Sequence, residues 1–387
     1  MKGCVRMRRF RGWDCAWVLA LLFMLLLSGC GERVIPVGFV ADLSGRGSLV
    51  GVSARDGALL AVAAANARIV GRHATIELTV LDDQGTSEGA VQADRELVAK
   101  GVKLVVGHAT SGPGQAGIPV LQAAGIPVLS PLMSAAALSG RKDGFYRIID
   151  ENTIQGRTLA DYALEAARRL NRPLRATVLT EAINGSYTSD VKNGFVAAWT
   201  EAGGEIAWED NYRAEGDIPF DRLAEGLAGS GADTCLIVTG GMDLGLLVQK
   251  VKALNPQARC YAGMWGMTAD FVQHAGAAGD GTVFPSIFDP NAAGDRWIAF
   301  KEQYVAAYGS PPNFAAVYGY EAMQVAIGAL EAAGSTKPER IGQALIEGAP
   351  WPGLQSDIPL DAYGDSARGY RLMTLASGTF VPVGDHE

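Results

Sequence analysis

The sequence VIPVGFV at residues 34–40, together with the segment that runs on to Asp82-Asp83, decides the fold class. Residues 34–40 form a short apolar run typical of a buried strand. Residues 51–66 then repeat apolar side chains at helical spacing, and residues 76–81 (IELTVL) form a second strand-like run that ends at the acidic pair. A helix between two strands requires parallel pairing and a right-handed crossover, so this stretch predicts a doubly wound parallel sheet.

The same alternation of strand and helix continues along the chain and begins again after Asn152. We expect strands at residues 104–106, 126–129, 176–179 and 236–238, and helices at residues 113–124, 154–169 and 189–202. Long helices at residues 298–308 and 318–333 must pack back on one of the sheets, and residues 369–375 and 379–383 resemble a terminal hairpin. Two consecutive α/β units in a chain of 387 residues predict two lobes, each with its own core.

The N-terminus has the three parts of a secretory signal. A basic start (Lys2 to Arg11) precedes an apolar run at residues 16–27, which is too short to span a bilayer, and then comes Leu27-Ser28-Gly29-Cys30. This segment resembles a bacterial lipoprotein signal, in which residues 1–29 are removed and Cys30 is acylated. The alternatives are an ordinary signal peptide with an incidental cysteine and an uncleaved membrane anchor. Gly31 gives no signal for retention at the inner membrane.

Composition argues against some classes of partner but does not decide whether the cysteines form a disulfide. The chain has 33 basic and 41 acidic residues, and residues 1–29 contain five basic residues and one acidic residue, so the mature part has a net charge of −12. An acidic surface without a basic stripe argues against nucleic acid and anionic lipid as partners. Cys235 and Cys260 remain in the mature part. An oxidising compartment would permit a disulfide between them, but we expect two buried thiols.

The residues give little support to enzyme chemistry. Gly45-Arg46-Gly47 with Gly51 resembles a dinucleotide-binding loop, but the acidic pair follows 37 residues after Gly45 instead of about 20. The four histidines are scattered, and no HExxH, Cys/His ligand spacing or GxSxG motif occurs. His108, at the end of a predicted strand, is expected to be structural, with a place in the ligand site as the alternative. We therefore expect no enzyme activity, cofactor or metal.

Taken together, the landmarks of the mature chain resemble the type I periplasmic solute-binding proteins of the leucine/isoleucine/valine-binding class, which supply ABC importers. These landmarks are Leu43-Ser44-Gly45, Gly51, Gly57-Ala58, Asp82-Asp83, Val106-Gly107-His108, Gly125-Ile126-Pro127-Val128, Ser130-Pro131, Tyr187, Phe195, Gly203-Gly204, Gly240-Gly241, Tyr318 and Ala322. The resemblance implies two doubly wound lobes joined by a three-segment hinge, with ligand bound in the cleft between them. Lobe 1 would comprise residues 34–149 plus 285–358, and lobe 2 residues 150–284 plus 359–387. The three crossovers would fall near residues 149–151, 284–286 and 357–366.

Two loops are candidates for the ligand site on the first lobe. Residues 109–112 lead from a strand into the helix at Pro113, and residues 130–134 lead from the next strand into an expected helix at residues 135–138. Helix N-termini present unpaired N–H groups that suit a carboxylate. The resemblance assigns Ser111 and Ser134 to the ligand carboxylate and the Leu132 carbonyl to a ligand ammonium, although serine at these positions also suits an N-cap. Tyr187 would close over the ligand from the second lobe, with a half-buried structural tyrosine as the alternative.

Three positions depart from the family pattern. Trp265 stands where amino-acid binders carry the glutamate that pairs with the ligand ammonium, Met242 replaces an aromatic residue, and Val50 replaces the aromatic residue that covers an aliphatic side chain. An ammonium buried without a partner is costly, so these changes favour an organic acid with an apolar or aromatic body against Trp265. The rival is an amino acid whose ammonium meets Asp243 and the Leu132 carbonyl. We expect Asp243, however, to be a solvated residue at the start of a helix.

We therefore expect an exported, lipid-anchored solute-binding lipoprotein that binds a small carboxylate-bearing ligand and delivers it to ABC permease subunits. The alternative is a receptor that passes its closed form to a membrane signalling protein. Both roles use lobe closure, so the sequence leaves both open.

The predicted lipid anchor can be tested at Cys30. Replacement of Cys30 by serine removes the thiol that would be acylated but leaves the mature body unchanged, so we expect a folded protein without lipid. Metabolic labelling with a fatty acid measures this directly. Label that persists in the Cys30→Ser protein would show that the anchor is elsewhere.

Overall fold

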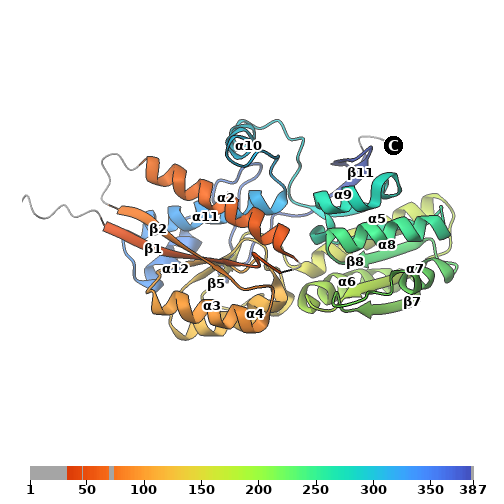
Figure 1. Cartoon of the computed structure of the whole chain (residues 1–387), viewed down its shortest axis with the longest axis horizontal. Helices are drawn as coiled ribbons and strands as arrows, with labels where there is room; N and C mark the ends of the chain where they lie inside the picture. Colours follow the sequence, from red (N-terminus) through yellow and green to blue (C-terminus); the bar gives the residue numbers. More distant parts are fainter. Residues whose placement is uncertain (1–32, 46, 69–73, 385–387) are drawn as a thin grey trace, which may run out of the picture.

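The computed structural model describes residues 33–45, 47–68 and 74–384, and the predicted signal with Cys30 lies outside these residues (Figure 1). The described chain forms two α/β lobes, each built on one sheet. The predicted fold class, two doubly wound and mainly parallel sheets, is confirmed.

The first lobe contains a parallel sheet in the order β2-β1-β3-β4-β5. Its strands are β1 (Arg33–Ala41), β2 (Ala74–Asp82), β3 (Val105–Gly107), β4 (Val128–Ser130) and β5 (Phe145–Arg147). One face is covered by α3 (Ser87–Ala99) and α4 (Ser111–Ala123), and the other by α2 (Ser48–Ala67) and α11 (Phe314–Ala333). Two further helices, α10 (Asp295–Tyr308) and α12 (Pro338–Glu347), flank α11 along the chain.

The second lobe contains a sheet in the order β12-β11-β10-β9-β8-β6-β7. Its parallel strands are β6 (Arg175–Glu181), β7 (Glu205–Tyr212), β8 (Thr234–Val238), β9 (Arg259–Ala262) and β10 (Val283–Ser286). The hairpin of β11 (Arg371–Ala376) and β12 (Thr379–Pro382) adds an antiparallel edge, as expected from the sequence. The helices are α5 (Asn152–Arg169), α6 (Gly185–Glu201), α7 (Phe220–Gly229), α8 (Gly241–Leu254) and α9 (Ala269–Ala275), with short 3₁₀ turns η2 (Met264–Gly266) and η3 (Gly276–Gly279).

Strand β8 shows why a continuous apolar run forms a central strand here. Cys235 and Ile237 point to the core beneath α7 and α8, whereas Leu236 and Val238 point to the core beneath α5 and α6. Helices cover both faces of a parallel sheet, so both sets of side chains are buried. Cys235 lies directly beside Cys260 of β9, and both thiols are free and buried, as predicted.

Each lobe contains a pair of helices that cross at glycines. A Cβ atom on Gly57 of α2 would overlap the carbonyl oxygen of Ala316 in α11, and one on Gly319 of α11 would overlap that of Ala54 in α2. Gly156 of α5 and Gly194 of α6 show the same reciprocal arrangement. These residues allow two backbones to touch, which explains how α2 and α11, far apart in the sequence, lie side by side (Figure 1). By length and composition α2 could span a membrane, but half of its apolar window is buried in this packing.

The chain passes between the lobes three times: between β5 and α5, between β10 and α10, and before β11. Asp150 joins two of these passages, because its carboxylate accepts hydrogen bonds from the backbone N–H groups of Arg368 (2.6 Å) and Gly369 (2.8 Å). The Arg368 side chain is buried and pairs with Glu321 of α11 at 2.6 Å. Before the third passage, the Gly364 carbonyl accepts a hydrogen bond from the backbone N–H of Arg147 in β5, at the edge of the first sheet. The division of the lobes residue by residue stays a prediction.

His108 is a structural residue at the end of β3, as expected. Its side chain is fully buried and bonds to Asp83 through Nδ1 (2.7 Å) and to Asp94 through Nε2 (3.1 Å). Burial alone would lower the pKa of His108, but the hydrogen bonds and charges of the two aspartates raise it to about 9. The His108 carbonyl accepts a hydrogen bond from Ser130, whose Oγ in turn accepts from the N–H of Met133. The buried, positively charged His108 therefore contacts both loops that lead toward the cleft, residues 109–112 and 130–134.

The helix crossing predicts a large effect of one methyl group. Gly57→Ala should lower the free energy of unfolding by about 1–3 kcal/mol, because the backbones of α2 and α11 must move apart. Gly229→Ala at the end of α7 is the control, since a Cβ atom there meets nothing within 4 Å and should leave stability equal or slightly higher. Urea unfolding measures the free energy of unfolding of both variants and of the natural protein. Equal stability of Gly57→Ala and the natural protein would contradict the close crossing.

The raised pKa of His108 predicts a pH dependence of stability. The folded pKa of about 9 lies above the unfolded value near ~6.5, so this stabilisation is complete below pH ~6.5 and is lost as pH rises toward 9. The free energy of unfolding should fall by roughly 3 kcal/mol across that window. In His108→Asn this fall should be absent, while any contribution of the buried thiols remains in both proteins. Parallel slopes of the two profiles would contradict the assignment, and Asp94→Asn should move the fall to lower pH.

Candidate functional site

Two adjacent cavities lie between the lobes, at the carboxyl ends of the parallel strands. The larger has a volume of about 290 Å³ and the smaller about 30 Å³. Both are bordered by the same four residues, Val50, Thr110, Asn184 and Trp265. A larger hollow of about 640 Å³ lies between the C-terminal halves of α2 and α11 and Trp351. It is remote from the strand ends, so we place the candidate site in the two cavities between the lobes.

The structure brings most of the predicted site residues to these cavities. Ser111, Leu132 and Tyr187 line the smaller cavity, Met242 lines the larger one, and Val50 and Trp265 border both. Each of the two lobes contributes to both cavities. Of the seven predicted positions, Ser134 alone lines neither.

Ser134 lies behind Ser111 and is fully buried. Its N–H donates to the Ser111 hydroxyl oxygen (3.2 Å), while its own hydroxyl bonds to Asn152 and to the Leu132 carbonyl. The expected helix at residues 135–138 is wrong, because only a 3₁₀ turn (η1, Ala136–Leu138) forms there. A turn of this length has no row of aligned peptide dipoles, so the helix-terminus argument applies to Ser111 at the start of α4 and not to Ser134.

Tyr187 and Trp265 form one aromatic wall on the second lobe. Their rings meet edge to face with centroids 6.0 Å apart, and the backbone N–H of Trp265 donates to the Tyr187 hydroxyl oxygen at 3.2 Å. The Tyr187 hydroxyl donates to Gln155 at 3.0 Å. Tyr187 lies in the first turn of α6 and is buried, so it is neither half-buried nor at a strand end, and its closing over a ligand stays a prediction. Burial raises the pKa of Tyr187 well above its ordinary value, which keeps the hydroxyl neutral.

Asp243 is not the solvated residue that the sequence predicts. It lies in the first turn of α8, is 4% exposed, and lines the larger cavity. Tyr212, at the end of β7, donates its hydroxyl to Asp243 Oδ2 at 2.8 Å and lies 2.6 Å from the Thr239 hydroxyl. The error has a physical reason: the residue that covers Asp243 comes from a strand 31 positions earlier, which no local pattern reveals.

Two further residues border both cavities: Asn184, which sequence reasoning missed, and Thr110, which lies in the candidate loop at residues 109–112 but was not singled out. Asn184 precedes α6, and its Oδ1 accepts a hydrogen bond from the Gly112 N–H across the cleft (3.1 Å). Thr110 precedes α4, and its hydroxyl is buried with no hydrogen-bond partner within the described part of the chain. Both stand at N-cap positions, where Asn and Thr are common, but neither side chain caps its helix. A helix-start signal at a strand end could have found them.

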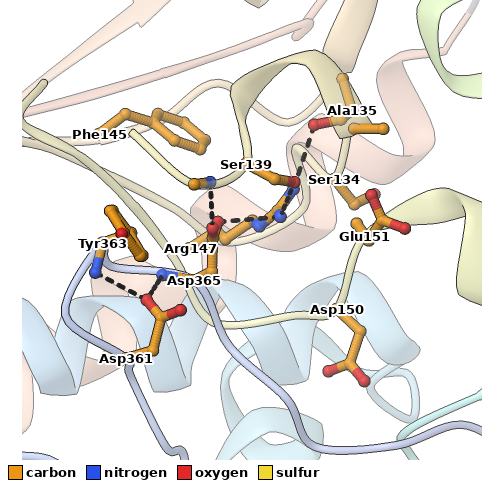
Figure 2. A network of polar contacts seen from close by, with 12 residues as sticks. Ser134, Ala135, Ser139, Phe145, Arg147, Asp150, Glu151, Asp361, Tyr363 and Asp365 are labelled. Carbon is orange, nitrogen blue, oxygen red and sulfur yellow. Dashed lines mark hydrogen bonds and ion pairs between the residues drawn. The ribbon is translucent and has the colours of Figure 1, made fainter. Parts of the chain in front are cut away.

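Arg147 holds the loop behind the site in place. Figure 2 shows its guanidinium group between the loop at Ala135–Ser139 and Asp365 from the C-terminal part of the chain. It donates to the Ala135 carbonyl (3.2 Å) and the Ser139 hydroxyl (2.5 Å) and pairs with Asp365 at 2.9 Å. Because Arg147 is almost fully buried, this network fixes residues 134–139 firmly against β5.

The site offers groups that can recognise a small molecule. Within residues 33–45, 47–68 and 74–384, no group of three or more His, Cys, Asp or Glu side chains is arranged to hold a metal ion. The hydroxyls, the aromatic wall and the start of α4 can hold a small polar molecule in a chamber enclosed by two lobes.

Comparisons with known proteins agree with this geometry. A family model described as "Periplasmic binding protein" matches residues 34–379. The Leu/Ile/Val-binding protein homolog 3 of Brucella melitensis is 26% identical over 321 residues, which cover 82% of this chain and 84% of the relative. The substrate-binding protein LivJ of Streptococcus pneumoniae, solved with isoleucine, has a TM-score of 0.80 at 24% identity and covers 90% and 98% of the two chains. A solute-binding protein of R. palustris, solved with benzoate, has a TM-score of 0.81 at 21% identity and covers 91% and 96%.

The predicted family is thereby confirmed, and with it the expectation that the protein is not an enzyme. The matched region includes strands β2 to β11, all of β1 but its first residue, and every described residue that borders the two cavities. The chain belongs to the periplasmic binding protein family, whose members bind solutes outside the cytoplasm.

Proposed function

We propose that this protein is the solute-binding component of an ABC importer, anchored to the membrane by a lipid on Cys30, and that its ligand is a small carboxylate with an apolar body. The observation that carries the proposal is the chamber between the lobes, where Ser111 at the start of α4 faces Trp265 of the second lobe. The N-terminus of a helix favours an anion, and the indole gives an apolar surface.

The named ligands of the two structural relatives support this choice of chemistry. Isoleucine and benzoate, bound to the Streptococcus pneumoniae and R. palustris proteins, share a carboxylate on an apolar body. Ser111 is the group that we assign to the carboxylate. Ser134 supports it from behind, because its N–H donates to Ser111 Oγ and leaves the Ser111 hydroxyl hydrogen available to a ligand.

Hydrogen bonds between the two lobes support the proposed closure. Besides the bond from Gly112 to Asn184, Ser186 Oγ donates to Gln115 (2.5 Å) and the Ala136 N–H donates to Asp190 (2.8 Å) across the cleft. Each such bond contributes about 0.5–1.5 kcal/mol net, so these contacts can orient the closed lobes but are small beside the binding energy of a ligand. Closure that depends on ligand is what an importer component requires.

Calorimetry on matched compounds tests the ligand class. Benzoate and pentanoate should bind at least tenfold more tightly than benzamide and pentanamide, because the amides lack the charge that the start of α4 favours. Ser111→Ala should weaken carboxylate binding by roughly 10–100-fold, as expected for a hydrogen bond to a charged group. Ser87→Ala is the control, since Ser87 also begins a helix but faces solvent.

Equal binding of acids and amides, or equal effects of the two serine substitutions, would contradict the carboxylate assignment. A thermal-shift measurement gives an independent readout, because ligand at about 100 times its dissociation constant should add roughly 2.7 kcal/mol of stability. Mass spectrometry after incubation should recover the ligand unchanged.

A further inference from the structure

The larger cavity has an acidic lining. All charged side chains among its described lining residues are carboxylates: Asp42, Glu181, Glu215, Asp243 and Asp270. Facing walls of one charge sign concentrate the potential inside a cleft. A second negative charge on a ligand would therefore be disfavoured there, whereas a positive charge would be attracted.

These carboxylates are not equivalent. Asp42 accepts hydrogen bonds from the N–H groups of Gly45 and Gly47, and Glu181 accepts from those of Ile183, Asn184 and Ala214, so both stabilise their own loops. Glu215 pairs with Arg213 at 2.8 Å on the exposed surface. Asp243 is buried like Asp42 and Glu181, but the group that bonds to its Oδ2 is a neutral side-chain hydroxyl, that of Tyr212.

A second observation, independent of the acidic residues, points to a ligand in the same space. The Thr110 hydroxyl is buried, with the residue only 9% exposed, and it has no hydrogen-bond partner in the described part of the chain. Thr110 borders both cavities, so its buried hydroxyl belongs to the wall that the two cavities share. Leaving a buried hydroxyl without a partner is unfavourable, and a polar ligand that passes Thr110 would remove that penalty.

The two cavities also separate the polar groups that a ligand would meet. Ser111 and Leu132 line only the smaller cavity, and Asp243 lines only the larger one. Trp265 borders both, and the face of an indole attracts cations as well as apolar groups. An ammonium on the carbon next to the carboxylate would lie beside Ser111 and Leu132 and away from Asp243. A cationic group at the far end of a chain would reach it.

We propose that the ligand carries two charged ends, a carboxylate at Ser111 and an ammonium or guanidinium group at Asp243, separated by an apolar segment that passes Thr110 and Trp265. The ligand class is thus an ω-amino or ω-guanidino carboxylate. This inference rests on the proposed function, because it assumes that the carboxylate lies at Ser111.

Calorimetry with linear acids of four to six carbons tests the separation of charges. 5-Aminopentanoate, or the best member of that ω-amino series, should bind at least tenfold more tightly than pentanoate and than 2-aminopentanoate. Glutarate, with a second carboxylate, should bind more weakly than pentanoate. Asp243→Asn should abolish the preference for the ω-amino compound, and Glu88→Gln, a control at an exposed carboxylate in the first turn of α3, should leave it unchanged.

Thr110→Val provides a second variant that does not disturb the charges. It should fold at least as stably as the natural protein and should bind 5-aminopentanoate several-fold more weakly, since the ligand loses the partner hydroxyl. Thermal melting of each variant separates loss of fold from loss of binding.

Several results would overturn the inference. These are equal binding of pentanoate and 5-aminopentanoate, tighter binding of 2-aminopentanoate or glutarate, and an ω-amino preference that survives Asp243→Asn. Failure of every ω-amino acid to bind would overturn it as well. The proposed function fails in a different way, through equal binding of pentanoate and pentanamide, so the two outcomes are distinguishable.

Discussion

The direction of the parallel strands determines where this protein can bind a ligand. In each sheet the carboxyl ends of parallel strands meet at one edge, and loops then lead into helices. Asp42 follows β1, Thr110 follows β3, Asn184 follows β6, Asp243 follows β8 and Trp265 follows β9. Groups from distant parts of the sequence meet there because the sheets are parallel. The antiparallel hairpin β11–β12 lies at the edge of its sheet and contributes no lining residue.

The binding loops stand on buried polar groups that hold them in fixed positions. His108 lies beneath both loops of the first lobe, and Arg147 holds the segment after Ser134. At the hinge, Asp150 accepts from two backbone N–H groups of another crossover, and Arg368 is paired with Glu321. Removing one partner of a buried ion pair typically costs about 3–5 kcal/mol, far more than any one of the hydrogen bonds across the cleft contributes. These buried polar groups are thus costlier to disrupt than the contacts across the cleft.

The sequence predicted the fold well because its signals are local. A run such as TCLIV is apolar on both faces, and the spacing of α-helical faces and β runs repeats through both lobes. The site was predicted only in part. Ser111, Leu132 and Trp265 line the smaller cavity, and their role in ligand binding stays a prediction. The burial of Asp243 beside Tyr212 and the unpartnered Thr110 hydroxyl were not predicted. Such facts arise from tertiary packing, which periodicity does not contain.

Trp265 and Asp243 have to be interpreted together. At Trp265 the family pattern has a carboxylate that pairs with an ammonium next to the ligand carboxylate; an indole there supplies an apolar and polarisable face instead. Had this been the only change, the cleft would suit a simple organic acid. The cavity continues past the indole, however, to a buried carboxylate on α8. Under the proposed assignment, the carboxylate of the cleft is Asp243 rather than residue 265, and a ligand that contacts both Ser111 and Asp243 would be longer than an α-amino acid with its charges on one carbon.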